Sequence, residues 1–348
     1  MSSFPDGSPA AATSRPSISV IVPTLNEERY IEGVLDDMFG QKGIDADVEV
    51  LVVDGGSTDR TRAIVESYAR RANVRLVDNP KRRQAPGFNL GIGQARGTIV
   101  CIIHAHARFS RNYLAACFDA RRRTGAANVG GVITHRGEGP MGEAIALAMS
   151  SPLGVGDSTY RHAKQEQWCD NIMGTFIDRK LFDEVGYYNE SNLVNEDCEF
   201  NYRLRAAGYK VLVSPSIEVT YFVRSSLVGL AKQYLLYGYY RRWTEVQHPG
   251  AVPWRVYVPP ALLVSLLGSA VLCAFGAIAW GIVVPVMYAC VLALGVADGM
   301  RRSKRLSVAL REPAAIATMH VAFGIGWLRG FFSLRRRRDV PHGRTAHL

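Results

Sequence analysis

The chain has 348 residues, 48% of which are hydrophobic, and a formal net charge of +10. This length holds one large domain and a smaller segment. The charge is concentrated near the C-terminus, because residues 1–250 carry 29 Lys and Arg against 28 Asp and Glu, whereas residues 251–348 carry 12 against 3. The six cysteines form no CxxC pair, which excludes a disulfide framework and a cysteine zinc site and fits a reducing compartment.

The first residues, MSSFPDGSPAAATSRPS, lack the apolar core of a secretory signal. We expect a disordered leader over residues 1–16. The domain that follows is expected to stay in the cytosol.

Strand, loop and helix then alternate three times along the chain. ISVIVPT, VEVLVVD and VRLVDNP are expected strands, each followed by a helical segment, before a fourth strand, TIVCII. This alternation is typical of an α/β fold with a mostly parallel sheet and helices on both faces. Ligands bind outside the carboxyl ends of such strands, which places the site on loops 23–28, 54–59 and 104–109.

The fourth strand leads into two histidines, His104 and His106. Side chains two residues apart in a strand point the same way. We therefore expect both imidazoles on one side of the chain, at the predicted site.

The later part of the domain, which we expect to span residues 17–225, is less regular. NVGGVI, MGTFI and YKVLVSPSIEVTYF predict strands, whereas DRKLFDEVG and NEDCEFNYRLRAAG predict helices. LVGLAKQYLLYGYYRRWTE predicts an aromatic, basic, amphipathic helix at a membrane surface. It lies in an interface helix and linker assigned to residues 226–252.

An apolar region follows the interface helix. Residues 256–297 are 42 residues without Asp, Glu, Lys or Arg, enough for two membrane crossings. The basic loop 301–311 is then expected in the cytoplasm. A third stretch, 314–328, fits a third crossing or a re-entrant or interfacial helix. We assign a membrane segment to 253–332 and a basic tail to 333–348. Basic residues that flank apolar spans indicate membrane lipids, and no nucleic acid, as the partner.

Four motifs resemble the family 2 glycosyltransferases in order and spacing: VIVPTLNEE, VDGGSTDRT, NEDCEFNYRLRAAGYKV and QYLLYGYYRRW. HAHARF is similar to the DAHARY metal loop of a subgroup that acts in succinoglycan biosynthesis. The resemblance covers about residues 17–250, and for the subgroup also the membrane tail. It implies an inverting enzyme of GT-A fold, with a Rossmann-like, mostly parallel sheet flanked by helices and a C-terminal transmembrane helical segment.

The resemblance also implies positions that bind a nucleotide-sugar donor. These are Pro23, Thr24, Asn26, Glu27, Asp54, Gly56, Ser57, Arg83 and His104. Structural roles compete with this interpretation. Asp54 alone would be a turn residue or helix cap, and Asn26 and Glu27 could cap the first helix.

Glu196-Asp197 looks like the family's ED motif, in which Asp197 is the general base and Glu196 supports it. Without the other motifs, both would be acids that favour a helix N-terminus. The resemblance further implies a donor and acceptor channel at Gly174, Gln233, Arg242 and Trp243. The spacing from Gln233 to Trp243 is longer than in the family, so packing at the membrane interface is an equal alternative.

The metal loop departs from the family, because most relatives carry Asp-x-Asp and this chain has no carboxylate there. Mg²⁺ prefers oxygen ligands, whereas imidazole suits Mn²⁺ better. Three alternatives follow. His106, with or without His104, ligates Mn²⁺ or Mg²⁺; or imidazolium or Arg82, Arg83 and Arg108 offset the phosphate charge without metal; or the site has decayed.

The resulting expectation is a multi-pass enzyme of the cell membrane with a cytoplasmic catalytic domain. It would move a sugar from a nucleotide sugar, a UDP-hexose, to a lipid-linked saccharide or polyprenyl phosphate acceptor, for exopolysaccharide or envelope glycan synthesis. The alternative is a non-catalytic membrane protein of GT-A fold that binds a nucleotide or glycan.

Overall fold

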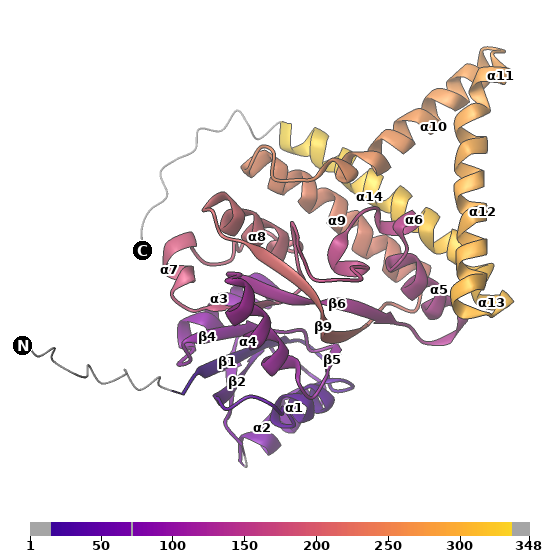
Figure 1. Ribbon diagram of the computed structural model, residues 1–348. Helices are drawn as coiled ribbons and strands as arrows, with labels where there is room; N and C mark the ends of the chain where they lie inside the picture. Colours follow the sequence, from indigo (N-terminus) through magenta and orange to yellow (C-terminus); the bar gives the residue numbers. More distant parts are fainter. Residues whose placement is uncertain (1–14, 71, 336–348) are drawn as a thin grey trace, which may run out of the picture.

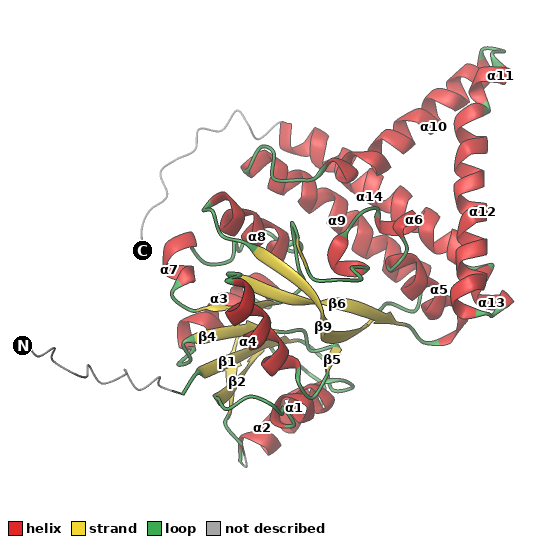
Figure 2. Cartoon of the chain, in the orientation of Figure 1, coloured by secondary structure: helices red, strands yellow, loops and turns green. Residues whose placement is uncertain are grey.

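The computed structural model describes residues 15–70 and 72–335 (Figure 1). The predicted leader 1–16 therefore lies almost wholly outside the described residues, as does most of the predicted basic tail 333–348. Between them, an α/β domain is followed by a long helical region (Figure 2).

The central sheet has five strands in the order β3-β2-β1-β4-β8. The strands are β1 (Ser17–Thr24), β2 (Asp47–Asp54), β3 (Val74–Asp78), β4 (Ile99–Ile102) and β8 (Thr175–Asp178). The first four run parallel, and β8 pairs antiparallel with β4. The predicted mostly parallel sheet is confirmed. Its inner strands are near-continuous apolar runs because both faces are covered.

Helices bury the two faces separately. They are α1 (Ile31–Phe39), α2 (Thr61–Ala69), α3 (Gln84–Gln94), α4 (Tyr113–Thr124), α7 (Leu181–Val185) and α8 (Glu196–Ala206). One core joins Val20 and Val22 of β1 to α1, α2 and α4. The other joins Ile21 of β1 to α3, α7 and α8. Alternate residues of a single strand thus supply both cores.

A second, smaller sheet lies beside the first and had not been separated from it by the sequence pattern. It contains β5 (Ala107–Phe109), β6 (Asn128–Arg136), β7 (Gln167–Trp168) and β9 (Val211–Phe222). The long strand β9 pairs with all three others. Because β5 starts just after the two histidines, this sheet holds the histidine loop against Tyr221 of β9.

Short helices and a long helical region complete the chain. They are α5 (Gly139–Met149), α6 (Pro152–Val155), a 3-10 turn at Thr159–Arg161, α9 (Leu227–Gln247), a 3-10 turn at Trp254–Tyr257, α10 (Val258–Ala274), α11 (Ile278–Gly281), α12 (Val283–Ser303), α13 (Leu306–Ala309) and α14 (Glu312–Arg335). α10 and α12 project away from the sheets and meet at α11 (Figure 1). The turn between them contains Gly276, with φ of 81°.

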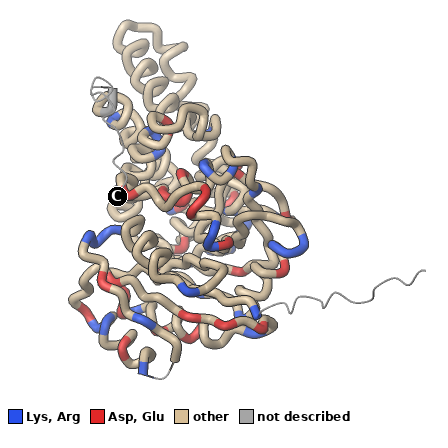
Figure 3. The backbone as a smooth tube through the Cα atoms, turned by 90° about the vertical axis from the view of Figure 1, so that its left-hand side faces the viewer, with Lys and Arg blue, Asp and Glu red and all other residues tan. Residues whose placement is uncertain are grey.

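Within the described residues, three segments are long and apolar enough to cross a membrane: Trp254–Ala274, Ile278–Ser303 and Leu306–Ser333. Figure 3 shows that the projecting helices carry few charged residues compared with the domain below. The third segment contains α13 and α14, separated by a turn at residues 310–311, and α14 extends beyond the predicted stretch 314–328 at both ends. The most apolar window of this segment is 39% buried, against 17% and 11% for the other two, because α14 packs along α9. The number of crossings stays a prediction.

Candidate active site

A cavity of about 1150 Å³ lies between the β4 end of the central sheet and the long C-terminal helices. His104 and His106 line it from the loop after β4, and Glu196 and Asp197 line it from the start of α8. α9 contributes Gln233, Tyr237 and Arg241 among others. The predicted loop, ED motif and aromatic helix therefore meet around one space.

The two imidazoles lie side by side, with ring centroids 6.0 Å apart. Nδ1 of His106 is 3.1 Å from Oε1 of Glu27, and its Nε2 is 2.9 Å from the hydroxyl of Tyr221. Nδ1 of His104 is 3.2 Å from the side-chain amide of Gln84. Burial, with a smaller contribution from His106, lowers the pKa of His104 to about 3. His104 is neutral at physiological pH and supplies no positive charge there.

These residues do not form a ready metal site. Across the described residues there is no group of three or more His, Cys, Asp or Glu side chains that could hold a metal ion. Both ring nitrogens of His106 already have protein partners. Within the described chain, Nε2 of His104 has no hydrogen-bond partner. Of the four ring nitrogens of His104 and His106, it is therefore the one that is free to bind a ligand. One neutral imidazole is a weak donor set for Mg²⁺, which requires oxygen ligands.

The arginines proposed to offset phosphate charge differ in availability. Arg108 forms a two-point ion pair with Asp37, at 2.7 Å for each contact. The guanidinium of Arg82 donates to the backbone carbonyls of Gly55 and Gly56. Arg83 is exposed just before α3, and its guanidinium has no hydrogen bond or ion pair within the described residues. Of the three, Arg83 has a guanidinium that is open to a ligand.

Asp54 organises the loop after β2. Its fully buried carboxylate accepts from the backbone N–H groups of Gly56 and Ser57, at 3.0 Å each, and from Arg62 at 2.9 Å. Burial raises the pKa of Asp54, but these bonds, led by those from Ser57, outweigh it and leave the pKa lowered. Thr24 donates to the same carboxylate at 3.3 Å. This geometry fits the alternative role of Asp54 as a turn residue. Direct contact between Asp54 and the nucleotide sugar stays a prediction.

Asn26 and Glu27 connect loops and do not cap α1. α1 begins after Tyr30, which makes no side-chain cap, so the predicted capping role was wrong. The Asn26 side-chain oxygen accepts from the backbone N–H of Thr58 at 2.8 Å, and Asn26 itself has φ of 57°. Glu27 instead holds His106, because the chain turns once more before the helix starts. Pro23 lies in β1 and Gly56 on the loop after β2. Of the predicted donor-binding residues, His104 lines the cavity and the other eight do not.

The ED pair sits at the start of α8. Asn195, with φ of 61°, precedes it and turns the chain so that both acids enter the cavity. The Asp197 carboxylate accepts hydrogen bonds from the backbone N–H of Cys198 at 2.8 Å and from the side-chain amide of Asn171 at 3.3 Å. Glu196 is 5% exposed. Burial, followed by the charge of Asp197, raises the pKa of Glu196 to about 8.

The raised pKa gives a stability prediction. The neutral form of Glu196 is favoured in the folded state, so stability is fully present below its ordinary pKa of 4.5 and is lost as pH rises through about 8. We expect Glu196→Gln to be about as stable as the wild type near pH 5 and more stable near pH 8, by up to roughly 1.4 kcal/mol per pH unit. Thermal unfolding across this range measures it. If the stability of the two proteins changed with pH in the same way, the result would contradict a buried, neutral Glu196.

The predicted channel residues differ in position, and their role as a donor and acceptor channel stays a prediction. Gly174, with φ of 81°, and Gln233 line the cavity. Arg242 and Trp243 do not: Arg242 pairs with Glu245 at 2.6 Å, and Trp243 donates to Ser191 outside the cavity. Each residue advances about 100° around a helix, so these two side chains turn away from the face that points inward.

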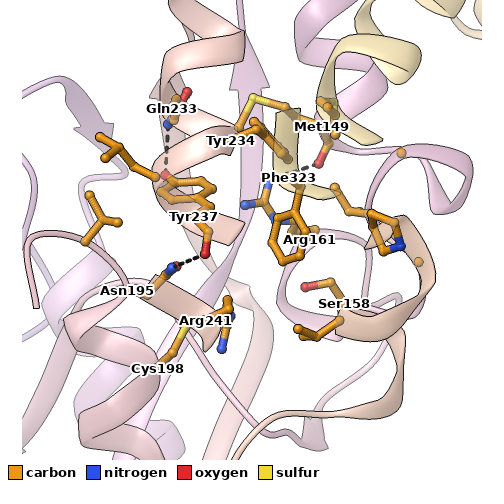
Figure 4. A pocket seen from close by; sticks show the side chains of 18 of the residues that line it. Met149, Ser158, Arg161, Asn195, Cys198, Gln233, Tyr234, Tyr237, Arg241 and Phe323 are labelled. Atoms are coloured by element: carbon orange, nitrogen blue, oxygen red, sulfur yellow. Dashed lines mark hydrogen bonds between the residues drawn. The ribbon is translucent and has the colours of Figure 1, made fainter. Parts of the chain in front are cut away.

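The cavity is lined instead by α9 residues at four-residue spacing, Gln233, Tyr237 and Arg241. The Gln233 amide donates to the Tyr237 hydroxyl at 2.8 Å, and Asn195 donates to the Tyr237 carbonyl at 3.1 Å (Figure 4). Tyr237 was not among the predicted site residues. The four-residue period was the signal that could have shown it.

The fold and the paired acids in the cavity define a glycosyltransferase of GT-A fold. The family model for glycosyl transferase family 2 matches residues 19–186. The chain is 30% identical over 321 residues to the succinoglycan biosynthesis protein ExoA of Rhizobium meliloti, covering 91% of this chain and 96% of that protein. The chain belongs to glycosyl transferase family 2.

Two further comparisons agree with this assignment. A Methanococcus voltae protein named dolichyl N-acetyl-α-D-glucosaminyl phosphate 3-β-D-2,3-diacetamido-2,3-dideoxy-β-D-glucuronosyltransferase is 31% identical over 230 residues, covering 64% of this chain and 71% of that protein. A mannosyltransferase structure from Pyrobaculum calidifontis, in complex with GDP-Man and Mn²⁺, has a TM-score of 0.59 at 20% identity. It covers 92% of this chain and 88% of that one, which shows a shared fold.

Proposed function

We propose that this glycosyltransferase is an inverting enzyme that transfers a sugar, from a UDP-hexose, to a lipid-linked saccharide or polyprenyl phosphate at the cytoplasmic face of the cell membrane. One observation carries the proposal. The same cavity that contains Asp197 and His104 is also lined by α10, α12 and α14, the apolar helices. An acceptor held in a membrane could reach the catalytic residues through that continuous space.

The chemistry follows from the position of Asp197. Its carboxylate takes the proton of the acceptor hydroxyl as the oxygen forms a bond to the anomeric carbon. The bond from that carbon to the donor phosphate breaks, and the diphosphate leaves with the electron pair. Attack from the face opposite the leaving group inverts the configuration. Neutral Glu196 beside the base adds no second negative charge near the phosphates.

The relatives support an acceptor of this class. One acts in succinoglycan biosynthesis by name, and the other has a dolichyl-linked sugar phosphate in its name. The test is a panel of radiolabelled UDP- and GDP-sugars offered to detergent-purified protein with membrane lipid extract. We expect label in the organic phase from a UDP-hexose. Transfer of label from GDP-sugars alone would overturn the assignment of a UDP-hexose as donor. Label in a water-soluble product alone would overturn the assignment of a lipid-linked acceptor.

Nucleotide binding without added metal is a separate prediction. Because the histidine loop offers one available imidazole nitrogen, we assign no catalytic step to a divalent ion bound by the protein. We expect UDP binding to be measurable by calorimetry in EDTA, and Mn²⁺ to strengthen it by less than about tenfold, or about 1.4 kcal/mol. His106→Ala should leave the effect of Mn²⁺ unchanged. Binding that requires Mn²⁺ and is lost in His106→Ala would restore the predicted metal ligand.

A further inference from the structure

The cavity has two chemically different ends. His104 and Asp197 lie at its catalytic end. The other end is lined by apolar side chains of the C-terminal helices, such as Leu262 of α10, Met287 of α12 and Phe323 of α14. A ligand that fills both ends must combine a polar head with a hydrocarbon chain, which is the composition of a lipid phosphate.

Arg161 lines the cavity beside Phe323 of α14 (Figure 4). Nη1 of Arg161 donates to the carbonyl of Met149 at 3.1 Å, and its Nε donates to the Tyr160 hydroxyl at 3.1 Å. No carboxylate of the described chain pairs with it. Arg255 lines the same cavity but is already neutralised by Asp157 and Asp170. Neutral groups therefore hold Arg161 in place, and no carboxylate among the described residues neutralises its positive charge.

The guanidinium of Arg241 faces the same space from α9. The carboxylates of Asp197 and Asp170 lie near enough to act on its charge, but it makes no hydrogen bond or ion pair to any residue that the structure describes (Figure 4). The hydroxyl of Tyr234 is buried beside Arg161, whose guanidinium can only donate to it, and its O–H has no acceptor within the described residues. A recessed guanidinium without a direct ion pair, and a buried hydroxyl without an acceptor, both cost stability. A bound anion would satisfy all three groups at once.

We propose that Arg161, together with Arg241 and Tyr234, forms a phosphate-binding subsite for the lipid-linked acceptor, whose hydrocarbon chain lies between α10, α12 and α14. This inference rests on the proposed function and adds the position of the acceptor's head group. Guanidinium groups form charge-assisted bonds to phosphate oxygens, and a phosphate can accept from several donors at once. The donor's diphosphate carries the same chemistry, so the test has to separate the two sources.

The test compares farnesyl phosphate with farnesol as probes, added to the full-length protein in detergent. Thermal stabilisation and calorimetry report binding, and UDP is titrated in parallel. We expect farnesyl phosphate to bind the wild type at least about tenfold more tightly than farnesol, or about 1.4 kcal/mol. Arg161→Gln should remove this preference while UDP affinity changes less than twofold. Arg161→Lys keeps the charge and should retain part of the preference.

Arg122→Gln is the matched control, because that arginine is exposed on α4, with 77% of its side chain accessible. It should leave both affinities unchanged, and circular dichroism should show that the variants fold. Equal binding of farnesyl phosphate and farnesol to the wild type would overturn the subsite. Loss of UDP affinity in Arg161→Gln, with the lipid preference intact, would assign Arg161 to the donor instead. Absence of UDP binding to the wild type would count against the proposed donor without touching the lipid result.

Discussion

Asp197→Asn should lower the rate of sugar transfer by about 10²–10⁴-fold, the usual contribution of a general base. The amide is nearly the same size and can still contact Asn171, so the fold and the cavity should persist. It cannot accept the proton of the acceptor hydroxyl. The initial rate of transfer, measured at saturating donor and acceptor, gives the effect on kcat.

The same variant should keep its affinity for UDP within about threefold, which calorimetry measures. Asp183→Asn, an exposed acid on α7, is the control and should transfer sugar at the wild-type rate. Transfer by Asp197→Asn at more than a tenth of the wild-type rate would remove Asp197 from the role of base. Glu196 would then be the candidate, despite its raised pKa.

Gly326→Ala should destabilise the protein and reduce transfer, even though alanine favours helix over glycine by about 1 kcal/mol. A Cβ atom at Gly326 would lie 2.0 Å from the backbone carbonyl oxygen of Leu235, and one at Gly238 would lie 2.0 Å from that of Phe323. Backbone atoms cannot rotate away, so α14 must separate from α9. Overpacking of this kind costs about 1–3 kcal/mol. Because α9 carries Gln233 and Arg241, the separation also changes the cavity.

The matched control is Gly268→Ala in α10, where an added Cβ meets no atom within 4 Å. It makes the same chemical change in another apolar helix. Thermal unfolding in detergent should show a lower Tm for Gly326→Ala and an equal or higher Tm for Gly268→Ala. Equal Tm values for the two variants would mean that α9 and α14 do not pack together as described.

The central sheet and the position of the site could be predicted because they depend on local patterns. Apolar runs that alternate with segments of helical periodicity predicted the parallel strands. The end of the fourth run predicted the position of His104 and His106, which line the cavity. The ED pair was found through its motif at a helix start. The small second sheet was not resolved, because pairing of β5, β6 and β9 joins segments far apart in the chain.

The errors and omissions in the site also have physical causes. Arg242 and Trp243 are implied by the resemblance of QYLLYGYYRRW to the family, whereas the orientation of α9 points Arg241 into the cavity. Asn26 and Glu27 were expected at the start of α1, but the chain makes another turn before Ile31. Arg161 lies on an irregular segment without a motif. Its importance depends on the absence of a carboxylate partner in the described structure, which is a property of the packed molecule.

The most direct test of this account is transfer of labelled sugar into the lipid fraction by purified full-length protein. The protein is incubated with UDP-[¹⁴C]hexose and a polyprenyl phosphate-linked acceptor extract, and the organic phase is counted. We predict label in the organic phase with the wild type, and at least about a hundredfold less with Asp197→Asn. Release of free sugar without lipid labelling, or equal labelling by both proteins, would contradict an enzyme whose membrane-lined cavity delivers a lipid acceptor to Asp197.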